Sequence, residues 1–310
     1  MIRIQATIFF TYLLAIGCPV ALFSKSTFAA LQLSFETAVL ADGSHSESWK
    51  MAILDRHSEQ ELAQVLMAKH PLNREEREWQ MLIQKESSRW KSTVENLNGP
   101  FDGIDPPKKV VLLFGNHGVD DGFTFRMDTI CLDLSSWFRA YGDASKPENA
   151  DRIQRILSHE YIHLLTSRFL ARKQPSLKSP LDRTLYELYY EGLGNFYSLS
   201  EKWRAEDGKT STVGVKALAR NIPIFFDRLN RLATASADDE IKLRHGLSSG
   251  PFPEKWGALT IALWLSKEHS ADPAALKRFI QAGPEGIPTF VKRHLPDNFR
   301  LKLVTQPSKY

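Results

Sequence analysis

Cysteine is almost absent from this sequence, which has only Cys18 and Cys131 among its 310 residues. Cys18 lies in an N-terminal segment that we expect to be removed or lipidated, so Cys131 would be alone in the mature chain. A lone cysteine excludes an intrachain disulfide as a source of stability. We therefore expect stability to come from a packed core, with or without a metal, and a hydrophobic content of 43% is typical of a globular protein.

Beyond its first thirty residues, the sequence also lacks long apolar runs. A basic start at Arg3, an apolar run over 8–23 and small residues up to Ala29 are typical of a secretory signal. We predict a signal peptide over residues 1–29, cleaved after Ala29, and a secreted or periplasmic protein. Two alternatives stay open: lipidation at Cys18, because the preceding residues resemble a lipobox, and an uncleaved anchor, because the run approaches the ~17 residues that span a bilayer.

An excess of one charge is the third feature that is missing. Loss of residues 1–30 removes Arg3 and Lys25 and no acid, which lowers the formal charge from +4 to +2. Phosphate backbones are bound by a basic surplus that this chain does not have, so we expect no nucleic-acid partner. We expect contact with a membrane only through the N-terminal anchor or the lipid at Cys18.

Apolar periodicity predicts the secondary structure. A short apolar run predicts a strand over 109–114 and an alternating pattern predicts one over 123–134, joined as a hairpin by the glycine and aspartate loop 115–122. Strands that precede helices indicate an α+β fold, mostly helical, with a small sheet before the helix that carries His159. We divide the mature chain into an N-terminal helical segment, 30–108, and a main domain, 109–310. Helical spacing predicts helices over 58–69, 74–96, 150–169, 182–203, 212–232, 256–269 and 273–281.

The predicted helix 150–169 contains the most informative motif, an H-E-x-x-H sequence from His159 to His163. Residues four apart lie on one helix face, so both imidazoles can bind one metal ion. Glu160, about 100° round the helix, then reaches a water on that metal. The alternative is a helix with two unrelated surface histidines. The apolar residues around the motif argue against it, because unpaired polar groups are costly to bury.

A catalytic zinc needs a third protein ligand. The metzincin extension is absent, since Thr166 and Phe169 occupy its glycine and histidine positions. Glu191, in the next predicted helix, is our candidate. Glu187, one turn earlier, is the other candidate for the third ligand. If it is not a ligand, it is either a hydrogen-bond acceptor for a ligand imidazole or a surface acid.

An H-E-x-x-H motif followed by Glu191-Gly192-Leu193-Gly194 on the next helix resembles the gluzincin metallopeptidases, the zincins whose third zinc ligand is a glutamate. The resemblance extends over roughly 109–200. It implies a zincin-like metallopeptidase domain and a peptide or protein substrate. The Asn-Glu-x-x-Ser-Asp form of the thermolysin branch is absent, so thermolysin-type specificity does not carry over. The resemblance implies that His159, His163 and Glu191 are the Zn²⁺ ligands. It also implies that Glu160 is the general base.

Glycine inside a helix costs ~1 kcal/mol relative to alanine, so Gly192 and Gly194 need compensation. We expect close approach of their helix to the H-E-x-x-H helix to supply it. The alternative is that these glycines end the helix at a turn.

The resemblance also suggests the rest of an active site. Gluzincins often use a downstream tyrosine or histidine as a second donor to the oxyanion, and His245 is our first candidate for this catalytic role, with Tyr190 second. The alternative for His245 is a plain surface histidine. Gluzincins align substrate along an edge strand before the active helix, which here implies Thr129–Leu134. The opposite wall would be the loop 248–253 and the helix from Trp256.

Two further residues receive structural interpretations. We expect Cys131 to be a small core residue of its strand rather than a metal ligand. His117 is interpreted as a solvated loop histidine, with a position lining a cleft as the alternative.

Three functions follow from these patterns. A zinc metallopeptidase is favoured. A non-catalytic envelope protein that keeps a zincin fold to bind a partner is the second, and Glu160 argues against it because a scaffold has no use for a base. The third is a zinc hydrolase of non-peptide amides or esters.

Overall fold

The computed structural model describes residues 31–56, 58–67, 69–117 and 120–295. The predicted signal peptide, its cleavage site and Cys18 lie outside these residues. From Leu31 on, the described residues belong to one compact unit. Within them, no helix combines the length and the apolar character needed to cross a membrane.

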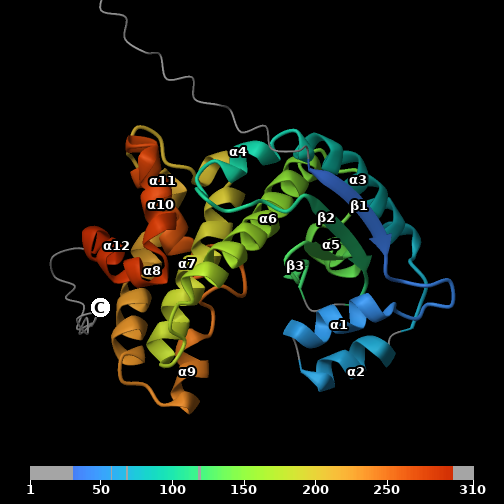
Figure 1. Ribbon diagram of the computed structural model, residues 1–310, viewed down its shortest axis with the longest axis horizontal. Helices are drawn as coiled ribbons and strands as arrows, with labels where there is room; N and C mark the ends of the chain where they lie inside the picture. The colour runs from blue at the N-terminus through green and yellow to red at the C-terminus, as the bar shows by residue number, and fades with distance from the viewer. Residues whose placement is uncertain (1–30, 57, 68, 118–119, 296–310) are drawn as a thin grey trace, which may run out of the picture. The chain divides into compact units, whose positions relative to one another are not determined.

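The described strands form one sheet in the order β1-β2-β4-β3 (Figure 1). Strands β1 and β2, and β2 and β4, pair in parallel, whereas β3 and β4 are antiparallel. The predicted hairpin between 109–114 and 123–134 is therefore wrong, because the true hairpin joins β3 to β4. The strands are β1 Gln32–Thr37, β2 Lys109–Gly115, β3 Gly122–Phe125 and β4 Thr129–Asp133.

The local sequence explains this correction. The predicted strand 123–134 is interrupted at Arg126, whose φ of 57° lies in the left-handed region and turns the chain back. Every residue of β4 is buried, which suits a strand with neighbours on both edges and cover on both faces.

The rest of the described chain is mostly helical, so the predicted α+β, mostly helical class with a small sheet before the H-E-x-x-H helix is confirmed. The predicted helix 74–96 divides after Lys91 into two helices. The α-helices are α1 Glu47–Arg56, α2 Glu59–Met67, α3 Arg74–Lys91, α4 Val94–Asn98, α5 Leu134–Tyr141, α6 Asn149–Lys173, α7 Pro180–Ser198, α8 Thr212–Leu232, α9 Ala237–Arg244, α10 Ala258–Ala271, α11 Ala274–Ala282 and α12 Ile287–His294. Short 3₁₀ helices are η1 Glu201–Trp203, η2 Phe252–Glu254 and η3 Pro284–Gly286.

Each side of the sheet packs against its own hydrophobic core, because successive side chains of a strand point to opposite sides. Leu112 of β2 and Ile130 of β4 join the main core with α3, α6, α7 and α10. Leu113 and Cys131 point the other way, into a smaller core with residues of α1 and α2. Cys131 is fully buried there, and burial raises the pKa of its thiol. The prediction that it is a small core residue is confirmed.

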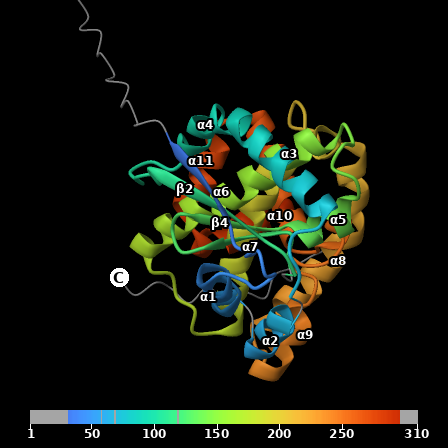
Figure 2. The same cartoon turned by 90° about the vertical axis from the view of Figure 1, so that its right-hand side faces the viewer.

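Helix α6 lies between the sheet and the C-terminal helices (Figures 1 and 2). It packs against α3, β3 and β4 on one side and against α7 on another, and α7 in turn packs against α10. The H-E-x-x-H segment of α6 therefore lies where the edge of the sheet meets α7.

Candidate metal centre

Three side chains from two helices converge at this junction. His159 and His163 lie on α6 and Glu191 on α7. The two Nε2 atoms are 2.9 Å apart, and they lie 3.6 Å and 3.7 Å from the carboxylate oxygens of Glu191. Zinc bonds of ~2.0–2.2 Å place neighbouring donors of a tetrahedral ion about 3.3 Å apart, close to these separations. The three residues form a group that is able to hold a metal ion.

The glycines of α7 explain how the two helices approach. A Cβ atom on Gly194 would lie 2.8 Å from His159 Cε1 and 2.9 Å from His163 Cε1, so only glycine leaves room for both imidazoles. Gly192 faces the other way, where a Cβ would lie 2.5 Å from Ile261 of α10. The expected close approach is thus confirmed for Gly194, whereas Gly192 permits contact with α10. Helix α7 continues through both glycines to Ser198, so they do not end it.

Tyr190 holds the ring of His163 in place. The two rings stack with centroids 4.0 Å apart and an interplanar angle of 3°. The tyrosine hydroxyl lies 3.2 Å from Ser167 Oγ, within hydrogen-bond distance. Its hydroxyl is therefore engaged by α6, and the placement favours a role in orienting His163 over the predicted role as second donor to an oxyanion.

Electrostatics suit the ligand roles. Burial lowers the pKa of His163 to about 3, so its imidazole is neutral at neutral pH. Burial opposes ionisation of Glu191, but the neighbouring His163 and His159 outweigh it and lower the pKa of its carboxyl. Burial would also lower the pKa of His159, yet the nearby carboxylates of Glu191 and Glu160 raise it. The negative charges of Glu160 and Glu191 that favour a proton on His159 also favour a metal cation bound beside it.

Glu160 lies beside this group without belonging to it. Its side chain is 5% exposed and lines the same cavity as the three ligand candidates. Its Oε2 atom has no hydrogen-bond partner among the described residues. Burial raises the pKa of this carboxyl to about 7. A base with a pKa near neutrality suits proton transfer at physiological pH.

The cavity over these residues has a volume of about 710 Å³. One wall is the loop Ser248–Phe252, as predicted, and another includes Gly122 of β3. The expected substrate strand Thr129–Leu134 is wrong: β4 is an inner strand whose edges already pair with β2 and β3. β3 is the edge strand beside α6. The helix after Trp256, α10, contributes no lining residue and packs behind α7.

Glu187 does not approach the imidazoles. It forms an ion pair with Arg244, and one of its oxygens accepts a hydrogen bond of 2.6 Å from Ser248 Oγ. This excludes both roles that the sequence left open at the metal, as third ligand and as acceptor for a ligand imidazole. Glu187 instead anchors the loop that forms one wall of the cavity.

His245 is not brought to the metal group. It is exposed and lines a separate cavity of about 410 Å³ with Arg220 and Arg228. The two cavities share only loop residues 249–251. The assignment of His245 as a catalytic donor is therefore withdrawn, because the loop that carries it places it outside the cavity of Glu160.

Two of the three cations that line the cavity act on the metal group, and the sequence analysis missed both. Arg56, at the end of α1, lies 2.9 Å from Asp120, and its charge lowers the pKa of both Glu160 and Glu191. Lys255 also lines the cavity, and its charge lowers the pKa of His163. Neither residue belongs to a motif, so no local signal marks them. His117, in contrast, lies half-buried against His70, so it is not fully solvated, and it does not line this cavity, which was the alternative.

Comparison of the chain with protein-family models, curated proteins and solved structures finds no match.

Proposed function

We propose that this protein is a zinc-dependent metallopeptidase of the gluzincin type. The observation that carries the proposal is the convergence of His159, His163 and Glu191, with Glu160 unpaired beside them in one cavity. Two imidazoles and one carboxylate are a common ligand set of catalytic zinc in hydrolases. The cavity leaves the fourth coordination position to water or substrate.

Each residue then has a defined role. His159, His163 and Glu191 hold the ion. A bound zinc ion supplies Lewis acidity, which makes water nucleophilic at neutral pH and polarises a carbonyl group. Glu160 accepts the proton of the attacking water and returns it to the leaving amine, a role supported by its raised pKa. Lys255 and Arg56, two of the three cations that line the cavity, can stabilise developing negative charge.

The free carboxylate of Glu160 also argues against a pure scaffold. A buried carboxylate oxygen without a hydrogen-bond partner is costly, and such costs persist at sites with a function. The substrate of a secreted or periplasmic enzyme would be a peptide or protein outside the cytoplasm. This location rests on the N-terminal signal pattern.

Metal analysis and a peptide-library digest test the proposal together. We expect about one zinc per chain at the α6–α7 centre and cleavage of peptide bonds that is abolished by chelation. Glu160→Gln is the matched control, because it removes the base and leaves the ligands. If the protein is purified without chelators, is given zinc, and still binds none, the proposal is refuted. Zinc with hydrolysis of esters but not of peptides would favour the non-peptide hydrolase.

A further inference from the structure

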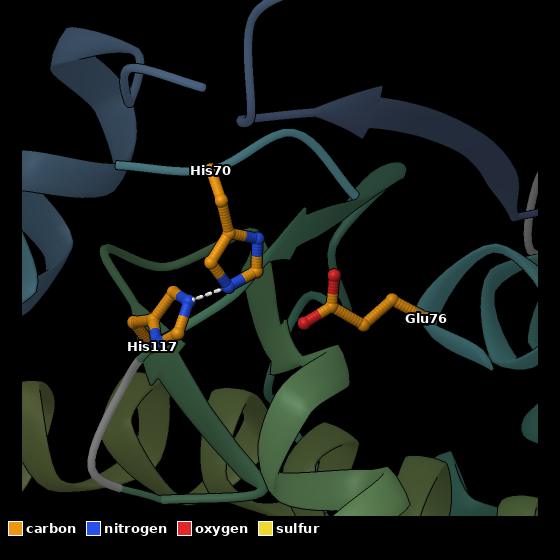
Figure 3. A group of neighbouring side chains, drawn as sticks. All are labelled: His70, Glu76 and His117. Carbon is orange, nitrogen blue, oxygen red and sulfur yellow. Dashed lines mark hydrogen bonds between the residues drawn. The ribbon is translucent and has the colours of Figure 1, made fainter. Parts of the chain in front are cut away.

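A second group of metal-ligating side chains lies outside the cavity just described. His70, Glu76 and His117 each offer one ligand atom, and the three atoms lie within 4.8 Å of one another (Figure 3). They come from three segments: the linker between α2 and α3, the first turn of α3, and the loop after β2. None of them lines the cavity of Glu160.

Hydrogen bonding defines which nitrogen of His70 is available. Its Nδ1 atom lies 2.8 Å from the carbonyl oxygen of Pro71. Since a carbonyl only accepts, Nδ1 carries the hydrogen, and in the neutral ring Nε2 presents a lone pair. That Nε2 atom faces Nε2 of His117, with the rings nearly perpendicular at 84° and their centroids 4.1 Å apart. A ligand imidazole held through Nδ1–H by a carbonyl is the usual arrangement at zinc.

Glu76 supplies a carboxylate beside the two rings. It is 1% exposed, and its Oε2 atom accepts the backbone N–H of Asn73 at 2.9 Å in a capping box. The amide of Asn116 approaches the same oxygen at 3.5 Å. An ionised carboxylate has about four acceptor positions, so capping leaves capacity for a cation. A buried charge of this kind gains from an opposite charge next to it.

The surroundings hold the three segments together. Asn116 is fully buried: its Oδ1 lies 2.8 Å from His45 Nε2, and its amide donates to the carbonyl of His70 at 3.4 Å. The next residue, His117, has a φ of 54°, a conformation that a residue other than glycine keeps only when its surroundings compensate. The backbone N–H of His117 donates to Ser135 Oγ at 2.9 Å.

We propose that His70, Glu76 and His117 form a second, structural metal site that takes a divalent ion of the zinc class. The ligand set of two imidazoles and one carboxylate suits zinc, and water completes the coordination. The ion ties the α2–α3 linker to the loop after β2. That loop leads to Asp120, Asp121 and Gly122, which line the cavity of Glu160. The second site therefore lies on the same connection between β2 and β3 as these lining residues, and it does not depend on the proposed peptidase activity.

Metal stoichiometry of the full chain, measured by plasma mass spectrometry after addition of Zn²⁺ and desalting, tests the site. We expect about two zinc ions per wild-type chain. The pair His70→Gln with His117→Asn should retain one, and asparagine is chosen because it tolerates the left-handed backbone. Glu76→Gln should weaken the second zinc at least about tenfold and keep helix α3 capped, since glutamine also serves in a capping box.

Asn73→Ala is the matched control: it removes the cap on α3 and leaves all three ligands, so it should lower stability and keep both zinc ions. A wild-type chain with one zinc that Glu191→Gln abolishes and Glu76→Gln leaves unchanged would overturn this proposal and leave the proposed function intact. One zinc lost in Glu76→Gln and retained in Glu191→Gln would support the second site and contradict the α6–α7 centre. If the double histidine variant fails to fold, the zinc content of Glu76→Gln, compared with that of Asn73→Ala, decides whether the second site exists.

Discussion

Glu160 is a buried carboxylate and Glu191 a partly exposed one, and the two have different partners in one cavity. Glu191 lies within 3.7 Å of both imidazole nitrogens, whereas Glu160 is outside the ligand group. We predict that Glu160→Gln keeps zinc at the wild-type stoichiometry and lowers kcat by about 10²–10⁴-fold, because it removes a base and no ligand. Plasma mass spectrometry and peptide hydrolysis on the same preparation measure both effects.

Glu191→Gln is the control for that experiment. It removes a coordination bond, so tight zinc binding and activity should both be lost. If Glu160→Gln released zinc as completely as Glu191→Gln, the division between base and ligand would be incorrect.

Glu187 gives a second prediction at the residue scale. Its partners are Arg244 and Ser248, so Glu187→Gln should leave zinc affinity unchanged within about twofold. Substitution of a residue that accepts a hydrogen bond from a ligand imidazole typically weakens metal affinity ~10 to 100-fold. Competition with a chromophoric chelator measures the affinity. A tenfold loss would show that Glu187 contacts an imidazole in solution.

The site residues divide into those with a local signal and those without one. His159, Glu160 and His163 were predictable because helical geometry alone brings them together, and Glu191 because of the glycines beside it and the resemblance to gluzincins. His245 was misplaced, since nothing local says on which side of a loop a histidine emerges. His70 and Glu76 were missed because their meeting with His117 depends on how α3 packs beside the sheet.

At the scale of elements, Gly192 and Gly194 allow one helix to make two contacts. Gly194→Ala would place a methyl group within 2.9 Å of the ligand imidazoles, and Gly192→Ala within 2.5 Å of Ile261 Cγ2. We predict that Gly194→Ala lowers zinc affinity at least about tenfold, because the rings must shift from the metal. Gly192→Ala should instead lower the free energy of unfolding by about 1–3 kcal/mol through overpacking against α10.

The two alanine variants are controls for each other, since both add one methyl group to the same helix. Isothermal calorimetry with zinc and urea unfolding separate them. Equal losses of zinc affinity in both variants would indicate general damage to α7 and contradict the assigned contacts.

Helices were predicted more accurately than the sheet for a physical reason. The span 212–232 agrees with α8 because helical periodicity and hydrogen bonds are local. Strand pairing joins distant segments: β1 pairs with β2 across more than seventy residues, in the register of Leu33 with Val110. The order of the strands in the sequence suggested a hairpin between β2 and β3. The turn at Arg126 instead pairs β3 with β4 as a hairpin. The unpredicted β1 has exposed residues in most positions and thus little apolar pattern.

At the scale of the molecule, a chain of ion pairs links α7 and α9, and the hydrogen bond from Ser248 to Glu187 extends it to the cavity loop. Glu240 of α9 contacts Arg183 of α7 and Arg244, which also pairs with Glu187. Glu240 is 7% exposed, but the side chains of Arg183 and Arg244 are 35% and 31% exposed, so solvent screens these contacts in part. The hydrogen bond from Arg183 outweighs burial and, with Arg244, lowers the pKa of Glu240 to about 2.

This shift predicts how the contribution of Glu240 changes with pH. A carboxyl whose folded pKa of about 2 lies below an unfolded value of ~4.3 stabilises the fold fully above pH ~4.3. Its contribution falls as the pH drops from there toward 2. Glu240→Gln should therefore cost on the order of 1–3 kcal/mol at pH 7, where the arginines lose their anionic partner, and progressively less below pH 4.

Urea unfolding of wild type and Glu240→Gln at pH 7, 4 and 3 measures this difference in the free energy of unfolding. Asp227→Asn is the control, because Asp227 pairs with Arg231 on α8 with its side chain 61% exposed. Such a surface pair contributes at most about 0.5 kcal/mol, so this variant should differ little from wild type at any pH. A cost of Glu240→Gln that stayed constant from pH 7 to pH 3 would mean that packing, and not the charge of Glu240, couples α9 to α7.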